Sequence, residues 1–154
     1  MTSQTESRLE ALGIKLPAAA APAANYVPAV ESQGYLYISG QIPMGPNGVE
    51  YVGKLGQELD IAAGQAAARL CAINILAQAK AALGDLDRIA RVVKLVGFVN
   101  SDPAFLDHPK VVNGASDFMV EALGDKGRHA RSAVGVAALP FNVGVEVEAI
   151  LEIA

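Results

Sequence analysis

The chain of 154 residues is poor in the side chains that bind metals or form crosslinks, with one cysteine, two histidines and no tryptophan. A single cysteine, Cys71, cannot form an internal disulfide, and its position in an apolar helical run favours a buried, inert thiol. With only His108 and His129 beside it, the sequence indicates no zinc or transition-metal site, and no cofactor is expected.

Charge is also scarce, since charged residues make up 18% of the chain and the net charge is −4. A chain of this kind has no electrostatic footprint for nucleic acid or an anionic membrane. No apolar run approaches the roughly 18–20 residues of a membrane span. The N-terminus lacks the basic-then-apolar order of a signal peptide, so we expect a cytoplasmic protein. Hydrophobic residues make up 52%, which favours additional area buried between subunits.

The apolar periodicity predicts a short N-terminal helix followed by a hairpin, a helix, a strand, a helix and two strands. The expected ranges are 3–12, then 27–30 with 35–39, 59–83, 89–99, 109–123, 130–138 and 143–153. This order is typical of one α+β domain over residues 1–154, with two helices on one face of a mixed sheet. The strand at 89–99 is apolar at nearly every residue and is expected to be buried on both faces. Two helices cannot cover the other sheet face, so we expect a homo-oligomer.

Two charged residues stand in the otherwise apolar strands of the last quarter of the chain. Arg131 begins one run, and Glu146 lies in the next, on the same face as Glu148. An arginine fork plus a nearby backbone N–H forms a carboxylate clamp, so Arg131 indicates either such a clamp or an ion pair at a subunit interface. Glu146 indicates either a site carboxylate or a solvated strand face. For Asn113, on the polar side of the second helix, a solvated or capping amide is the default interpretation, and Tyr26 is compatible with ordinary packing.

Five sequence blocks resemble the signature of the YjgF/Rid family, the reactive intermediate deaminases. The blocks occur in the family's order and span nearly the whole chain after residue 25. Residues 127–136, together with an N-terminal extension over residues 1–25, resemble the longer branch of the family. The blocks are Ser39-Gly40-Gln41-Ile42-Pro43, Val112-Asn113-Gly114, Ala130-Arg131-Ser132, Leu139-Pro140 and Val145-Glu146-Val147-Glu148-Ala149-Ile150.

The resemblance implies a chorismate-mutase-like fold and a homotrimer with sites in the clefts between subunits. It implies that Arg131 binds a substrate carboxylate with help from the backbone N–H of Ala133, and that Glu146 positions an attacking water. The other residues that it places in the pocket are Tyr26, Gly40 and Asn113.

The chain departs from the family's best-known members at two positions. Ala133 stands where they carry a cysteine, and Gly135 stands where they carry a glutamate. A backbone N–H survives any change of side chain, so carboxylate binding is retained, whereas any role of the thiol is lost. We expect the insertion around residues 100–108 and the lead-in at 126–129 to reshape the pocket.

The implied reaction is the cofactor-independent hydrolysis of an imine or enamine derived from an amino acid, which releases a 2-keto acid and ammonia. A second hypothesis is a regulatory module that binds a small carboxylate without turning it over. A third follows the family's older label of endoribonuclease or translation inhibitor. It ranks lowest because the net charge is negative and Arg128 with His129 is the one candidate pair for RNA cleavage.

Overall fold

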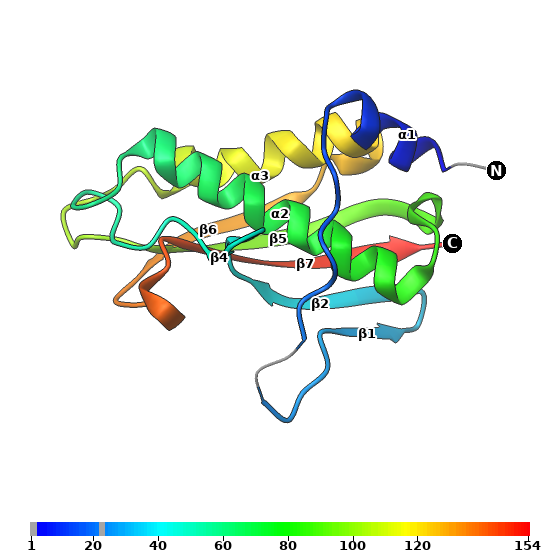
Figure 1. Cartoon of the computed structure of the whole chain (residues 1–154), viewed down its shortest axis with the longest axis horizontal. Coiled ribbons are helices and arrows are strands. Elements are labelled where there is room, and N and C mark those ends of the chain that lie inside the picture. Colours follow the sequence, from blue (N-terminus) through cyan, green and yellow to red (C-terminus); the bar gives the residue numbers. More distant parts are fainter. Residues whose placement is uncertain (1–2, 22–23) are drawn as a thin grey trace.

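The computed structural model describes residues 3–21 and 24–154, which form a layer of helices over a layer of strands (Figure 1). The predicted order of elements is confirmed. In chain order, the elements are α1 (Gln4–Ala11), β1 (Ala29–Ser32), β2 (Tyr35–Gln41), β3 (Met44–Gly45), β4 (Gly48–Val49), α2 (Ile61–Leu83), η1 (Leu86–Arg88), β5 (Ile89–Asn100), α3 (His108–Leu123), η2 (Gly124–Gly127), β6 (Ala130–Val136), η3 (Pro140–Asn142) and β7 (Val145–Ile153).

The main sheet is mixed, as predicted, and its strands run in the spatial order β1-β2-β7-β5-β6. Every neighbouring pair is antiparallel except β5 and β6, which are parallel and connected through α3. The last two strands of the chain are therefore not neighbours, because β5 lies between them. α2 and α3 lie on one face of this sheet (Figure 1). The predicted α+β arrangement is thus confirmed.

The ends of the two long helices follow from local chemistry. The Asp60 side chain accepts a hydrogen bond from the backbone N–H of Ala63 at 2.8 Å, so α2 begins two residues later than predicted. Gly84 ends it with a positive φ of 78°. Pro109 lies in the first turn of α3, and Gly124 ends that helix with a φ of 65°.

The short β3–β4 hairpin lies in a Gly-rich segment between the expected strand 35–39 and helix 59–83, for which the sequence predicts no helix or strand. Met44 pairs with Val49, and Gly45 pairs with Gly48. Two-residue strands are too short to show alternation, so the pattern of the sequence could not reveal them.

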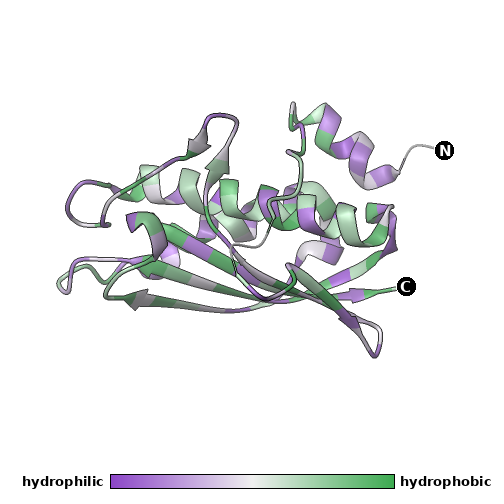
Figure 2. Ribbon diagram, turned by 60° about the horizontal axis from the view of Figure 1, so that its bottom comes forward, coloured by the Kyte–Doolittle hydropathy of each residue, from purple (hydrophilic) through white to green (hydrophobic). Residues whose placement is uncertain are grey.

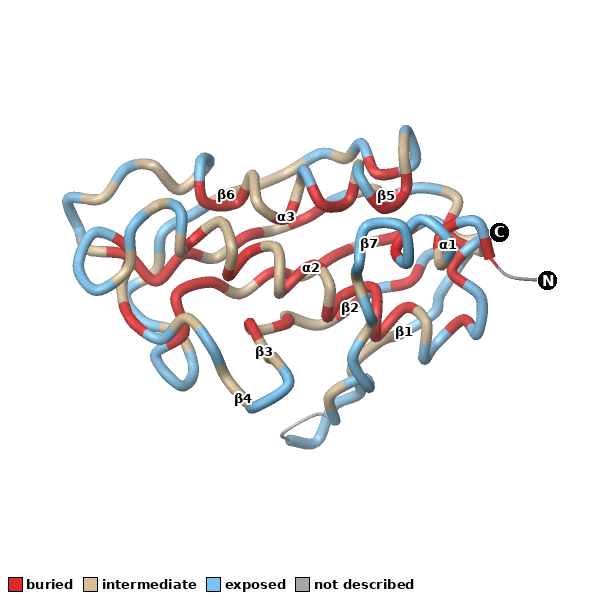
Figure 3. The backbone as a smooth tube through the Cα atoms, turned by 45° about the horizontal axis from the view of Figure 1, so that its top comes forward, coloured by how far each residue is buried: buried red, intermediate tan, exposed pale blue. Residues whose placement is uncertain are grey.

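α2 is the central helix of the core, and Figure 3 shows its buried residues between α3 and the strands. It is 23 residues long and, by length and composition alone, apolar enough to cross a membrane, so the expectation that no run approaches that length was wrong. Within the described residues, 61% of its most apolar window is buried inside the fold, which is the behaviour of a core helix. Cys71 is fully buried on it, as predicted, and burial raises the pKa of its thiol.

The opposite face of the sheet has no helix over it among the described residues (Figure 2). The expectation that residues 89–99 are buried on both faces is therefore wrong for a single chain. In β5, Leu95 and Val99 are buried toward the helices, whereas Lys94 is exposed and Val96 only half-buried on the other face. Large apolar side chains remain exposed on the strands of this sheet, namely Val30, Tyr35, Tyr37 and Val134.

The N-terminal helix α1 is held to the domain by Asp87 of η1. The Asp87 carboxylate accepts hydrogen bonds from the Ser3 hydroxyl at 2.8 Å and from the backbone N–H of Gln4 at 2.7 Å. The backbone N–H and the hydroxyl of Thr5 donate to it at 3.0 Å each. The hydrogen bond from the Thr5 backbone has the largest effect on the Asp87 carboxylate. Together with the others it holds the pKa of Asp87 well below its usual range. Leu9 is buried on this helix, whereas Leu12, which lies beyond its end, is 41% exposed.

Candidate functional site

Arg131 lies at the start of β6 and points toward α3. It pairs with Leu95 of β5 in the register, and Leu95 is buried against the helices. Its guanidinium Nη1 donates to Asn113 Oδ1 at 2.8 Å and to Ser116 Oγ at 3.2 Å. Asn113 is therefore neither a solvated nor a capping amide, because its side chain holds the arginine.

The partners of Arg131 are neutral oxygens. Among the described residues no carboxylate forms an ion pair with it, and both of its hydrogen bonds use Nη1. An arginine remains charged at any physiological pH. The half-buried guanidinium thus keeps Nη2 and Nε available. These two nitrogens can donate two parallel hydrogen bonds to the oxygens of an external carboxylate.

Ala133 and Gly135 follow Arg131 on the same face of β6, opposite Gly97 and Val99 of β5. Ala133 is half-buried against the core. β6 is an edge strand of the sheet, and such a strand has backbone groups that the sheet leaves unbonded.

Gly135 is exposed but lies close to two side chains, those of Ser101 after β5 and of His108 at the start of α3. A Cβ at this position would overlap Nε2 of His108 and lie 2.8 Å from Oγ of Ser101. These two side chains are themselves 3.1 Å apart. The space that a glutamate would need at position 135 is therefore occupied by His108 and Ser101.

Glu146 lies in a second, separate group of predicted residues. A pocket of about 290 Å³ is lined by Tyr26, Gly40 and Glu146. Gly40 is essential to this arrangement because a Cβ on it would overlap the Glu146 carboxylate. The pocket's remaining lining residues are Ala20, Ala21, Pro28, Ser39, Gln41, Ile42, Met44, Gln78, Pro140 and Phe141.

The environment of Glu146 shifts the titration of its carboxyl upward from the ordinary range. Burial raises the pKa of its carboxyl above the usual value, and the nearby charge of Glu148 raises it further. A carboxylate with a raised pKa is a better proton acceptor near neutral pH than an ordinary surface glutamate. The alternative of a fully solvated strand face is therefore wrong for Glu146.

Sequence reasoning missed Phe141 as a lining residue of this pocket. It lies in η3, has a positive φ of 58° and is 70% exposed. The following residue, Asn142, has a φ of 57°. A non-glycine residue in this conformation is uncommon and frequently marks a functional segment, although the Pro-Phe-Asn sequence indicated only a turn.

The two groups of predicted residues lie on opposite faces of the sheet. Arg131 pairs with Leu95, whereas Glu146 pairs with Phe98. Residues 95 and 98 of one strand are an odd number apart, so their side chains point to opposite faces. The structure therefore brings Arg131 to Asn113 on the helix face and Glu146 to Tyr26 and Gly40 on the other. Within one chain it does not bring Arg131 and Glu146 together.

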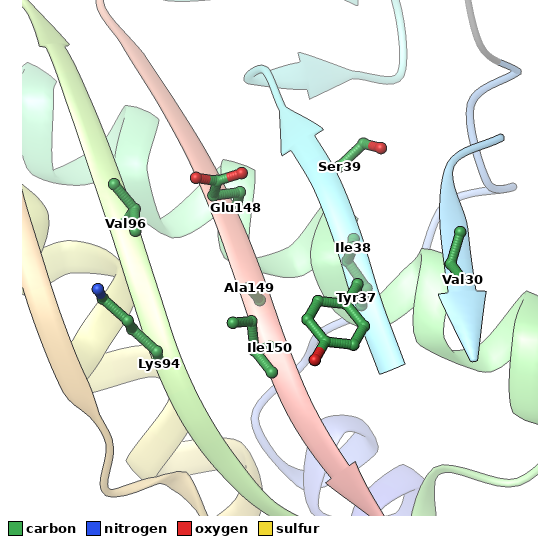
Figure 4. A pocket seen from close by; sticks show the side chains of 9 residues that line it. All are labelled: Val30, Tyr37, Ile38, Ser39, Lys94, Val96, Glu148, Ala149 and Ile150. Atoms are coloured by element: carbon green, nitrogen blue, oxygen red, sulfur yellow. The ribbon is translucent and has the colours of Figure 1, made fainter. Parts of the chain in front are cut away.

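The sheet face without helices is hollowed beside Glu148 (Figure 4). Lys94 of β5, Glu148 of β7 and Tyr37 of β2 project from it, around a pocket of about 260 Å³. Its lining is largely apolar, with Val30, Val96 and Ile150 among the contributors, so this face combines apolar surface with one charge of each sign.

No group of three or more histidine, cysteine, aspartate or glutamate side chains within residues 3–21 and 24–154 could hold a metal ion. The chemistry available at either group of predicted residues is therefore that of arginine, amide, hydroxyl and carboxylate groups.

Comparison with known proteins places these observations in a family context. Residues 6–153 match the family model described as "YjgF/chorismate mutase-like, putative endoribonuclease". The chain is 53% identical to protein TCP17 of Trypanosoma cruzi, over 99% of this chain and 96% of that protein. The crystal structure of protein Atu1372 from Agrobacterium tumefaciens superimposes with a TM-score of 0.92 at 53% identity, over 97% and 92% of the two chains. A structure of E. coli TdcF with bound serine matches with a TM-score of 0.64 at 29% identity, over 88% and 94%.

Proposed function

The chain belongs to the YjgF/chorismate mutase-like family, and on this premise we propose that it hydrolyses 2-imino acids and their enamine tautomers to 2-keto acids and ammonia. One observation carries the proposal above all. Arg131 is a half-buried cation whose partners among the described residues, Asn113 and Ser116, are neutral and leave donors for a carboxylate. A 2-imino acid has its carboxylate directly beside the reacting carbon, so one clamp binds the substrate and positions the reaction.

The complete site requires two copies of the chain, because Arg131 and Glu146 face opposite sides of one sheet. We therefore place the site between subunits of a homotrimer, with the Arg131 group of one copy facing the Glu146 pocket of the next. The exposed Tyr37 and Val134 on the helix-free side of the sheet support such an assembly. Apolar area of this kind is usually covered by a partner.

In the proposed mechanism, Arg131 and the backbone N–H of Ala133 bind the substrate carboxylate and fix the imine carbon. Glu146 accepts a proton from a water molecule as the water oxygen attacks that carbon. The C=N double bond becomes a C–N single bond, and the nitrogen takes up the proton that Glu146 holds, which restores the carboxylate. The resulting carbinolamine transfers its hydroxyl proton to the nitrogen by way of the same carboxylate, and the C–N bond breaks to release ammonia as the C=O bond of the ketone forms. No external oxidant, reductant or cofactor is needed to balance these steps.

A second candidate is a module that binds a carboxylate without turnover. The structure of TdcF with bound serine shows that a relative at 29% identity holds an amino acid. Ala133 and Gly135, which replace side chains of the best-known members, also favour this alternative. Endoribonuclease activity stays the lowest-ranked candidate, because the chain has a net charge of −4.

A coupled assay separates these candidates. A PLP-dependent serine or threonine dehydratase generates the enamine in situ, and formation of the 2-keto acid is followed with and without the protein. We expect the wild-type protein to accelerate its formation, and Arg131→Ala to reduce kcat/KM on the order of 100-fold, as for removal of a preorganised donor.

The matched control is Arg128→Ala, which removes an exposed arginine three residues before the clamp. Its side chain pairs with the exposed Asp125 and, among the described residues, forms no hydrogen bond to Asn113, Ser116 or Arg131. This control should retain wild-type turnover. No acceleration by the wild-type protein, combined with saturable binding of a 2-keto acid, would favour the binding module. Wild-type turnover by Arg131→Ala would refute the assignment of the clamp.

A further inference from the structure

A series of hydrogen bonds connects Arg131 of β6, through Ser116 of α3, to His129, which lies just before β6. Arg131 Nη1 lies 3.2 Å from Ser116 Oγ, and Ser116 Oγ lies 2.8 Å from His129 Nε2. His129 Nδ1 lies 2.6 Å from the carbonyl oxygen of Gly127. Both nitrogens of the imidazole are therefore engaged, and one of them is linked to the carboxylate clamp.

The direction of each hydrogen bond follows from the chemistry of its ends. The Gly127 carbonyl can only accept, so Nδ1 of His129 carries the proton that it donates. In the neutral ring Nε2 is then an acceptor, and the Ser116 hydroxyl donates to it. The lone pairs of Ser116 consequently face the guanidinium, which can only donate. A neutral His129 in this tautomer thus orients Ser116 to accept from Arg131.

The surroundings keep His129 in that neutral form. Its ring is half-buried, and burial lowers the pKa of the imidazole below its usual value. The hydrogen bond to Gly127 opposes this effect, and the charge of Arg131 lowers the pKa further. A second cation beside the guanidinium is therefore disfavoured at neutral pH.

We propose that His129 is a positioning residue for the substrate carboxylate, because through Ser116 it fixes the guanidinium of Arg131 in its binding orientation. This inference rests on the proposed function, since it assumes that Arg131 binds the carboxylate. His129 itself touches no substrate in this scheme. It determines where the clamp points and couples the clamp to pH.

Several of the charged groups on the elements packed around His129 form bonds elsewhere. Arg91 donates to the backbone carbonyl of Arg128 at 2.9 Å, and Glu121 pairs with Arg69 at 3.0 Å. Among the described residues, Arg131 is the one side chain whose charge lowers the pKa of His129. The charged and titratable residues of these elements are Asp125, Lys126, Arg128 and Arg131 on its own segment, Arg91 and Lys94 on β5, His108, Lys110, Asp117 and Glu121 on α3, and Glu6, Arg8 and Glu10 on α1.

The coupling to pH has a defined sign. Protonation of His129 places a hydrogen on Nε2, so the ring can no longer accept from Ser116 and the orientation of Arg131 is lost. Binding that requires the neutral imidazole is opposed by protons. Carboxylate affinity should therefore decrease as the pH falls through the pKa of His129, which lies below the ordinary histidine value.

The test uses 2-oxobutanoate, a stable 2-keto acid, as the probe in titration calorimetry. All variants carry Glu146→Gln, which removes the other titrating group of the proposed site. In this background we expect Ser116→Ala and His129→Phe each to weaken binding roughly tenfold, as for loss of a hydrogen bond to a charged group. The two changes together should weaken binding of 2-oxobutanoate no further than either alone, because both break the same series of hydrogen bonds to Arg131.

His129→Gln separates positioning from packing, because the Gln side-chain oxygen can accept from Ser116 as Nε2 does but cannot titrate. We expect this variant to bind more tightly than His129→Phe and to show no pH dependence. His108→Gln is the matched control, since His108 is hydrogen-bonded to Ser101 and takes no part in the hydrogen bonds that link His129 to Arg131. It should keep both the affinity and the pH dependence. The imidazole ¹⁵N spectrum should also show His129 protonated on Nδ1.

Each negative outcome has a distinct meaning. Unchanged affinity in His129→Phe, with binding lost in Arg131→Ala, would overturn the positioning role and leave the proposed function intact. A His129 ring protonated on Nε2 in the free protein would overturn it as well. Wild-type affinity in Arg131→Ala, or no binding of 2-oxobutanoate by the parent protein, would refute the proposed function and this inference with it.

Discussion

Gly40 provides the sharpest test of the role of Glu146, because it leaves space for that carboxylate. A Cβ on Gly40 would lie 2.9 Å from Cδ of Glu146 and 3.1 Å from Cγ, closer than the ordinary contact of 3.4–4 Å. Gly40 does not have a positive φ, so alanine at this position is free of backbone strain. Gly40→Ala should therefore displace the Glu146 carboxylate without straining the backbone at residue 40.

The size of the effect follows from the displacement. To reach ordinary contact, Cδ of Glu146 must move from 2.9 Å to at least 3.4 Å, about 0.5 Å, and the nearer oxygen must move further. A misplacement of about 1 Å can cost on the order of 100-fold in rate, so we expect kcat to fall by about tenfold or more. Stability should fall at the lower end of the roughly 1–3 kcal/mol typical of overpacking, because the carboxylate end of the side chain can move.

The assay is the coupled measurement of 2-keto acid formation, with kcat and KM determined separately. A water-positioning carboxylate acts mainly in the transition state, so kcat should fall more than the affinity for 2-oxobutanoate. Gly45→Ala is the matched control, because its Cβ would also overlap a carboxylate, that of the exposed Glu50. Glu50 lies outside both groups of predicted residues, and this control should keep wild-type kcat.

Two results would refute this reasoning. Wild-type kcat in Gly40→Ala, in a protein that folds and assembles normally, would mean that the position of the Glu146 carboxylate does not matter. The second is a double variant, Gly40→Ala with Glu146→Gln, whose kcat falls by the product of the two single effects. If the alanine acts by displacing Glu146, the combination should be no worse than Glu146→Gln alone.

Three further predictions follow from the charges and the open sheet face. Because the pKa of Glu146 is raised, kcat/KM should fall with decreasing pH through a midpoint above 4.5. Glu148→Gln removes one cause of the shift and should lower that midpoint. A midpoint at or below 4.5 in the wild-type protein would contradict the raised pKa. The pKa of Asp87 is lowered, so its stabilisation is present above about pH 3.9 and lost as the pH falls below it. At neutral pH, Asp87→Asn should lower Tm and increase hydrogen exchange in α1, whereas unchanged exchange would argue against the anchor. Tyr37→Lys should convert the proposed trimer to monomers in sedimentation velocity, and an intact trimer would place the interface elsewhere.

Much of the local structure could be predicted from the sequence because its causes are local. Gly84 and Gly124 end their helices, Pro109 marks the first turn of α3, and alternation along 145–153 places Glu146 away from Val145 and Val147. These features depend on backbone preferences and on side-chain period, which act over a few residues. The family blocks likewise identified the residues of both groups.

The short β3–β4 hairpin and the exposure of Lys94 could not be predicted in this way. The apolar run of residues 89–99 indicated burial on both faces, but the face that carries Lys94 and Val96 has no helix over it among the described residues. The involvement of Phe141 was also missed, because a Pro-Phe-Asn turn has no pattern that distinguishes a lining residue from a simple connection.

The sequence by itself determined the order of the elements, the ends of the helices and the identities of Arg131, Asn113, Gly40 and Glu146 as candidates. Only the tertiary structure decided that these candidates form two groups on opposite faces, because that depends on β5 lying between β6 and β7 and on its register with each. The tertiary structure likewise decided that His129 reaches Arg131 through Ser116. Such contacts between distant segments depend on strand pairing and helix packing, and no short stretch of sequence encodes them.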